Sequence, residues 1–122
     1  MTVVQLLKLA KKLRDPEKGC PWDKEQDFDS FKHCLVEEAN EVIQAIDLKD
    51  WENLKEELGD TLFNLVFLIN LAEEKKLFTL TDVVDGIYHK MIHRHPHVFG
   101  DQKAKDAQEA YEIFQKAKKK SL

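Results

Sequence analysis

Five acidic residues recur at helical spacing in two short segments of the chain. Glu37, Glu38 and Glu41 form the first group, and Glu57 and Asp60 form the second. At about 100° per residue, Glu38 falls inside the apolar stripe of its helix, and Glu57 merges into similar surroundings on the next helix. Carboxylates that share apolar surroundings lose hydration and repel one another, so something must neutralise them. Lysine or arginine side chains could do this, and so could divalent cations.

The donor atoms of these residues indicate which cation would suit them. A set made only of carboxylate oxygens favours Mg²⁺, with Mn²⁺ possible, over zinc, which prefers histidine and cysteine. Di-iron helical bundles use Glu-x-x-His pairs, whereas Glu38 is followed at the third position by Glu41, and Glu57 by Asp60. The residues therefore disfavour iron. The alternative is a solvated acidic helix face, because 34% of the residues are charged.

Two basic residues, Lys90 and Arg94, are predicted to share the inward side of a later helix. Two like charges at i and i+4 are unfavourable there unless an anion lies opposite. That anion could be the carboxylate cluster or a substrate phosphate, which lysine binds as a point charge and arginine as a planar fork. Metal, phosphate and basic side chains together are typical of phosphoryl chemistry.

Aromatic and histidine side chains offer weaker signals. Trp22 falls in a loop, where it could stack on a nucleobase or fix the loop to the core. His89 and His93 have the spacing of a zinc-binding pair, but they lie off the apolar face and are predicted to be solvent-exposed. His95 and His97 could end a helix or line the site, and the sequence assigns them no role.

The positions of glycine and proline divide the chain into helices. Only four glycines and three prolines occur, which disfavours an all-β fold, and most of them fall in two predicted loops at 15–23 and 96–100. Apolar periodicity predicts an all-α bundle of about five helices: one before residue 15, then 28–48, 49 or 50 to 75, about 80–95 and 104–119. Asp27 or Asp29 is predicted to cap the second helix, and residues 79–82 resemble a capping box. The acidic site would lie between antiparallel helices.

The segment 61–72 is apolar around nearly its whole circumference. A helix of that kind must be covered on every side. Because four other helices can hardly do so in a chain of 122 residues, we expect a homodimer that buries this helix in a shared bundle. A fully internal helix in a monomer is the alternative.

Composition limits the remaining possibilities. The length fits one domain, 1–122, and a net charge of −4 argues against binding nucleic acid through bulk positive charge. No apolar run reaches the roughly 18–20 residues of a membrane span, and the start lacks a signal peptide, so we expect a cytoplasmic protein with no membrane segment. Cys20 and Cys34 do not make a disulfide scaffold and have no evident partner base for nucleophilic catalysis.

Four segments in order resemble the MazG nucleotide pyrophosphohydrolases of the all-α NTP pyrophosphatase superfamily. They read GCPWDKEQ at 19–26, LVEEANE at 35–41, EELGD at 56–60 and KMIHRHPHVFGD at 90–101. The resemblance covers about residues 5–118. The five acidic residues described above meet the family motif E-E-x-x-E, spacer, E-x-x-D.

The resemblance implies a reaction and roles for these residues. The reaction is NTP or dNTP plus water to NMP or dNMP plus diphosphate, by attack of water at the α-phosphorus with Mg²⁺. Glu38, Glu41, Glu57 and Asp60 would hold metal ions, and Glu37 would be the general base unless Glu38 takes that role. Lys90 and Arg94 match positions that face the phosphates. Family members form homodimers or larger assemblies, such as a dimer of dimers.

Other functions stay open at this point. Longer MazG proteins carry two such domains, and this chain resembles the N-terminal one. Dimeric dUTPases and phosphoribosyl-ATP pyrophosphohydrolases share the acidic residues but lack the GCPWD and HPHVF segments. A non-catalytic dimeric helical interaction module, with a structural acidic cluster, is the non-enzymatic alternative. Base preference depends on the shape of the pocket, which no motif reveals.

Overall fold

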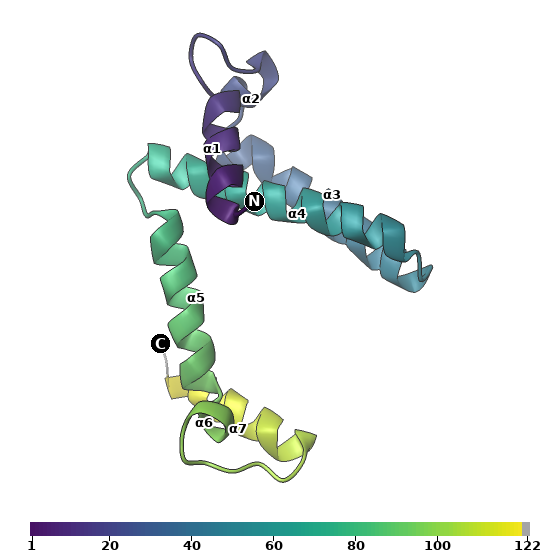
Figure 1. Ribbon diagram of the computed structural model, residues 1–122, viewed down its shortest axis with the longest axis vertical. Coiled ribbons are helices and arrows are strands. Elements are labelled where there is room, and N and C mark those ends of the chain that lie inside the picture. The colour runs from purple at the N-terminus through teal and green to yellow at the C-terminus, as the bar shows by residue number, and fades with distance from the viewer. Residues whose placement is uncertain (121–122) are drawn as a thin grey trace. The chain divides into compact units, whose positions relative to one another are not determined.

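The computed structural model describes residues 1–120, and this part of the chain contains helices and no β-strand (Figure 1). The predicted all-α class is therefore confirmed. The helices are α1 (Val3–Leu13), α2 (Pro21–Glu25), α3 (Phe28–Asp47), α4 (Trp51–Glu74), α5 (Leu80–Arg94), α6 (Pro96–Phe99) and α7 (Ala107–Lys120). They form two compact units: Met1–Leu80, and a second unit that begins at Thr81. Within residues 1–120, no helix has both the length and the apolarity needed to cross a membrane.

The prediction of about five helices was too low, because each predicted loop contains a short helix. Both α2 and α6 begin with a proline, whose fixed φ suits the first helical position. Helices of one turn are too short to produce an apolar period that a sequence reveals. The last helix also begins later than predicted, at Ala107. There the Asp106 carboxylate accepts a hydrogen bond from the Glu109 backbone N–H at 2.9 Å and caps the helix.

The two long helices of the first unit begin at side-chain caps. Of the two predicted capping residues for α3, Asp27 is the correct one: its carboxylate accepts from the Ser30 backbone N–H at 2.8 Å. The Ser30 hydroxyl accepts in return from the Asp27 N–H at 3.0 Å, which completes a capping box. Asp50 caps α4 by accepting from the Asn53 N–H at 3.2 Å. Lys49 adopts a φ of 54° between the helices, and this short turn makes α3 and α4 antiparallel.

The core of the first unit lies where α1 and α3 pack against α4 (Figure 1). Phe31 of α3 and Phe67 of α4 stack there, with ring centroids 4.1 Å apart. The other buried apolar residues of this cluster are Leu7, Ala10, Val66, Leu71 and Leu80. The stacked pair fixes the register of α3 against α4, and this register positions the acidic residues.

The apolar segment of α4 is not covered on every side within the described part of the chain. Val66 and Phe67 are buried, but Leu62 and Leu65 are 40% and 44% exposed. An internal helix in a monomer, the alternative considered above, stays open. The homodimer stays a prediction.

Glu73 joins three elements at the C-terminal end of α4. Its carboxylate accepts from Lys11 Nζ of α1 at 2.8 Å and from the Leu80 backbone N–H, at the start of α5, at 2.8 Å. These two hydrogen bonds, that from Lys11 foremost, lower the pKa of the Glu73 carboxyl. The charged carboxylate therefore stabilises the fold.

Replacement of Glu73 should make this contribution measurable. A carboxyl whose pKa is lowered by folding stabilises the protein above its unfolded value, here 4.5, and loses that effect as the pH falls through the folded value. We expect Glu73→Gln to reduce the free energy of unfolding by about 1–2 kcal/mol at pH 7 and by much less at pH 3. Urea denaturation at both pH values would measure this. Glu52→Gln, which breaks a surface ion pair with Lys55, is the control and should have little effect.

Candidate metal centre

The antiparallel register of α3 and α4 brings acidic residues of both helices together. Phe31 lies against Phe67, and Asn64 Nδ2 of α4 donates to the Cys34 carbonyl of α3 at 3.2 Å. Each further step toward the end of α3 is matched by an equal step toward the start of α4. Continued by two turns, this register places Glu41 opposite Glu57.

Three of the five predicted acidic residues form one cluster. Glu38 and Glu41 of α3 and Glu57 of α4 each offer a carboxylate oxygen, and these oxygens all lie within 4.8 Å of one another. Three carboxylates at this separation have the spacing and the hard oxygen donors that suit a divalent cation such as Mg²⁺. We call these three residues the acidic cluster.

Two buried oxygens of the acidic cluster have no hydrogen-bond partner. Glu57 is only 9% exposed, and its Oε2 atom is buried and unpaired among the described residues. The Oε2 atom of half-buried Glu38 is likewise buried and has no hydrogen-bond partner among the described residues. A buried, unpaired carboxylate oxygen is costly, and a bound cation would satisfy it. The residues present therefore fit a divalent metal ion.

Mutual repulsion changes the acidity of the acidic cluster. A hydrogen bond with the Glu57 carboxyl, then the charge of Glu57, raises the pKa of Glu41. The hydrogen bond with Glu41 lowers the pKa of Glu57, but burial, a hydrogen bond with Glu38 and the charges of Glu38 and Asp60 outweigh it. The net pKa of Glu57 is raised. Without a metal ion, the acidic cluster thus favours bound protons, for which a cation would compete.

The other two predicted acidic residues lie outside this three-oxygen group. Asp60 is exposed one turn after Glu57, yet its charge contributes to the raised pKa values of Glu41 and Glu57. Glu37 is exposed on α3, next to half-buried Glu38. A role for Asp60 as a metal ligand and for Glu37 as a base stays a prediction.

Asn64 is a residue of the site that the sequence analysis did not single out. Its side-chain bond to the Cys34 carbonyl joins α3 to α4 between the aromatic stack and the acidic cluster. Nearby, the Thr61 hydroxyl donates to the backbone carbonyl of Glu57, one turn earlier in α4, at 2.8 Å. The available signal was an amide side chain inside an otherwise apolar helix stripe. Such a residue needs a partner when it is half-buried.

The predicted phosphate-binding residues belong to the second unit. Lys90 lies exposed on α5, and Arg94 is half-buried near its end, with its guanidinium carbon 5.9 Å from the centre of the Phe114 ring of α7. The acidic cluster belongs to the first unit, so a role of Lys90 and Arg94 in binding phosphate beside it stays a prediction.

Four histidines of the second unit differ in their exposure and contacts. His89 and His93 are both exposed, as predicted, and no group of possible metal ligands in residues 1–120 includes either of them. His95 Nδ1 lies 2.6 Å from the Met91 carbonyl, one turn back, so His95 ends α5. Nδ1 of His97 is buried and has no partner among the described residues.

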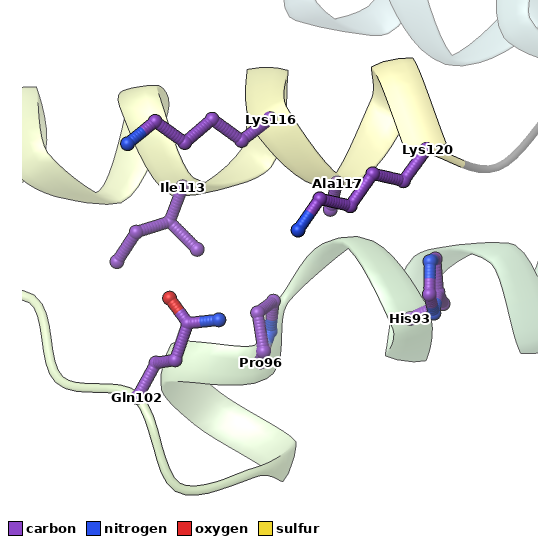
Figure 2. Close-up of a pocket in the computed structure, with 7 residues that line it drawn as sticks. All are labelled: His93, Pro96, Gln102, Ile113, Lys116, Ala117 and Lys120. Carbon is purple, nitrogen blue, oxygen red and sulfur yellow. The ribbon is translucent and has the colours of Figure 1, made fainter.

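A pocket of about 240 Å³ opens between α7 and the segment around α6 (Figure 2). Lys116 and Lys120 project from α7 on one side, and Pro96 and Gln102 lie on the other. The remaining lining residues are His93, Ile113 and Ala117. Neither Lys90 nor Arg94 lines this pocket, so it is separate from the predicted phosphate-binding pair.

Trp22 lies in the short helix α2 rather than in a loop. Its side chain is 53% exposed, and its ring centroid is 6.4 Å from that of Phe31 in a tilted arrangement. One part of the indole therefore contacts the core, as expected for a residue that fixes the segment, while another part is available to a ligand.

Comparisons with known proteins show the family of the chain. Residues 26–99 match the MazG nucleotide pyrophosphohydrolase domain. The chain is 42% identical over 114 residues to a nucleoside triphosphate pyrophosphohydrolase of Escherichia coli (strain K12), which covers 93% of this chain and 43% of the relative. It is 44% identical over 119 residues to the nucleoside triphosphate pyrophosphohydrolase/pyrophosphatase MazG of Thermotoga maritima, covering 96% of the chain and 46% of the relative. The chain thus spans less than half the length of these relatives.

A solved structure is similar over nearly the whole chain. The crystal structure of a mazG-related protein from Thermotoga maritima has a TM-score of 0.76 and 28% sequence identity, and the match covers 95% of this chain and 98% of that one. The domain match extends over more than half of the chain and includes all five predicted acidic residues. The chain therefore belongs to the MazG nucleotide pyrophosphohydrolase domain family.

Proposed function

We propose that the protein is a metal-dependent nucleoside triphosphate pyrophosphohydrolase. It would convert NTP or dNTP and water to NMP or dNMP and diphosphate. The observation that carries this proposal is the acidic cluster, in which oxygens of Glu38, Glu41 and Glu57 converge within 4.8 Å in a chain of this family. The activities for which the Escherichia coli and Thermotoga maritima relatives are named support the same reaction.

The acidic cluster would hold Mg²⁺, with Mn²⁺ as an alternative. Glu38, Glu41 and Glu57 supply ligands, and Asp60 either adds a ligand or acts through its charge. When bound there, the ion would supply Lewis acidity for the attacking water and positive charge for the phosphates and the leaving diphosphate. The two unpaired oxygens support this assignment, because the ion would satisfy both.

The remaining predicted residues would bind substrate and move a proton. Glu37 is exposed and lies next to a metal ligand, so its carboxylate would take the proton of the attacking water, unless Glu38 does so instead. Lys90 and Arg94 would bind phosphate oxygens. Trp22 would stack on the nucleobase, which its exposure of 53% allows.

The homodimer belongs to the same proposal. Leu58, Leu62 and Leu65 are exposed on α4. Leu62 also lines an apolar surface depression with Val3 and Leu6 of the α1 segment. Burial of these side chains against a second copy would remove apolar surface from water.

A nucleotide panel in H₂¹⁸O tests the proposed reaction. We expect Mg²⁺-dependent conversion of NTPs or dNTPs to monophosphate and diphosphate, with the ¹⁸O atom in the monophosphate because water attacks the α-phosphorus. Ion-exchange chromatography and mass spectrometry would identify both products. Release of orthophosphate, or no metal-dependent turnover of any nucleotide, would contradict the proposal. Turnover of dUTP alone, or of phosphoribosyl-ATP alone, would favour the related enzymes instead.

A further inference from the structure

Arg14 makes an unusual number of hydrogen bonds for a residue at the end of a helix. It caps α1, and its Nε and Nη2 atoms donate to the two carboxylate oxygens of Glu74 on α4, at 2.6 and 2.9 Å. Its Nη1 atom donates to the backbone carbonyls of Asp23 and Gln26, at 2.5 and 2.9 Å. The Arg14 side chain is only 14% exposed, and its guanidinium lies 5.7 Å from the centre of the Phe67 ring.

These bonds fix the short helix α2 to the core. A helix of five residues cannot maintain its own conformation, because it forms too few internal hydrogen bonds. Arg14 supplies external donors to two carbonyls at its C-terminal end, those of Asp23 and Gln26. The Gln26 side chain in turn donates from Nε2 to the Trp22 carbonyl at 2.9 Å. Side-chain donors thereby hold three carbonyls of the segment, those of Trp22, Asp23 and Gln26.

The Glu74 carboxylate, itself held by Asn70, orients the guanidinium of Arg14. Asn70 is fully buried, and its Nδ2 atom donates to Glu74 Oε2 at 3.0 Å. Glu74 therefore receives three donated bonds, two from Arg14 and one from Asn70. Lysine could not replace Arg14, because an ammonium group lacks the planar fork that reaches a carboxylate and two carbonyls together.

The Trp22 ring contacts Phe31, a residue of α3 that lies two turns before the acidic cluster. Its neighbour Phe31 precedes Glu38 by seven residues, so the two lie on the same face of α3, about 10 Å apart along the axis. A nucleotide bound with phosphates at the acidic cluster could reach the exposed part of the indole with its base.

We propose that Arg14, oriented by Glu74, positions Trp22 as the stacking surface for the nucleobase of the substrate. Arg14 is thus a positioning residue that acts through α2 and does not touch the nucleotide. This inference rests on the proposed function, since it takes a nucleoside triphosphate as the ligand. It explains why the segment around Trp22 receives two hydrogen bonds from a side chain that two further bonds to Glu74 orient.

The fluorescence of Trp22 provides the test. The background variant is Trp51→Phe, because Trp51 is 61% exposed at the start of α4 and its removal leaves Trp22 as the only tryptophan. The probe is α,β-methylene ATP with Mg²⁺, which cannot be cleaved between the α- and β-phosphorus atoms. Inorganic triphosphate is the probe without a base. We expect α,β-methylene ATP to quench Trp22 and inorganic triphosphate to leave its emission unchanged.

Variants of the contacts then separate positioning from simple stability. In Arg14→Gln and Arg14→Lys we expect half-maximal quenching to require about ten times more analogue, and KM to rise similarly while kcat changes less than threefold. The Glu74 side chain is 40% exposed, so Glu74→Gln should fold, and it should show a smaller change in the same direction. The matched control is Lys11→Gln, which breaks another ion pair between α1 and α4 but does not contact residues 22–26.

The outcomes distinguish this inference from the proposed function. Unchanged quenching and KM in folded Arg14→Gln and Glu74→Gln would overturn the positioning role. Hydrolysis by the parent protein without any quenching by α,β-methylene ATP would overturn the stacking surface and leave the proposed function intact. Quenching by the analogue without hydrolysis of any nucleotide would contradict the proposed function and leave the stacking surface supported.

Discussion

Glu57→Gln should abolish metal-dependent turnover and, in the same protein, raise the melting temperature of the metal-free form. Glu57 is the most buried member of the acidic cluster, and it joins α4 to the two carboxylates of α3. Glutamine keeps the shape of the side chain but removes its charge, so a metal ion loses an anionic ligand. We expect turnover to fall by about a hundredfold or more, since even outer-sphere partners of metal ligands contribute 10–100-fold. The proposed reaction is the assay.

The gain in stability should depend on pH in a defined direction. Folding raises the pKa of Glu57 above 4.5, so its effect on stability is favourable below that value and is lost as the pH rises through the folded value. In the metal-free protein the charged carboxylate is therefore destabilising near neutral pH. The difference in melting temperature between Glu57→Gln and the parent protein should be small at pH 4 and should grow toward pH 7. Mg²⁺ should raise the melting temperature of the parent protein but not that of Glu57→Gln.

The adjacent residue provides the control. Glu56 is exposed on the same turn of α4 and lies outside the acidic cluster, so Glu56→Gln makes the same change of charge without removing a ligand. It should retain turnover and the thermal shift with Mg²⁺. If Glu57→Gln also retained turnover and the thermal shift with Mg²⁺, the acidic cluster would be structural. The non-catalytic interaction module would then become the better interpretation.

Helical periodicity could predict which acidic residues approach one another. Placement on a wheel turns Glu38 and Glu57 inward, and the structure brings both into the acidic cluster. The wheel could not decide between Glu41 and Asp60 as the third member, because Glu41 lies about 60° from Glu38 and Asp60 about 60° from Glu57. That choice depends on the register between helices, which the Phe31–Phe67 stack and the Asn64 side chain determine. Register is a property of packed side chains, not of one helix.

The sequence could not reveal helices of one turn or contacts between residues that lie far apart in the chain. Helix α2 has a single turn and no apolar period, so the segment around Trp22 was predicted to be a loop. The ion pair of Arg14 with Glu74 spans 60 residues, and no local pattern marks it. Boundaries of the long helices, in contrast, were predicted to within one or two residues, because aspartate caps at Asp27 and Asp50 mark where they begin.

Phe67→Ala should destabilise the protein more than any surface substitution, because this ring is fully buried where α1, α3 and α4 meet. It stacks on Phe31 at 4.1 Å and lies beneath the Arg14 guanidinium at 5.7 Å. Removal of a buried phenyl group leaves a cavity and costs about 3–5 kcal/mol. Urea denaturation followed by circular dichroism would measure the loss. The control, Phe78→Ala, removes a ring that is 44% exposed and should cost much less.

The same ring connects stability to the proposed site. Phe31, which stacks on Phe67, also contacts Trp22, so the core beneath α2 supports the indole directly as well as through Arg14. Phe67→Leu keeps most of the buried volume and should cost less than Phe67→Ala, yet it removes the aromatic face beneath Arg14. We therefore expect Phe67→Leu to fold and to bind α,β-methylene ATP more weakly at Trp22. If its quenching matched that of the parent protein, the ring would serve only to fill the core, and Arg14 would hold Trp22 without it.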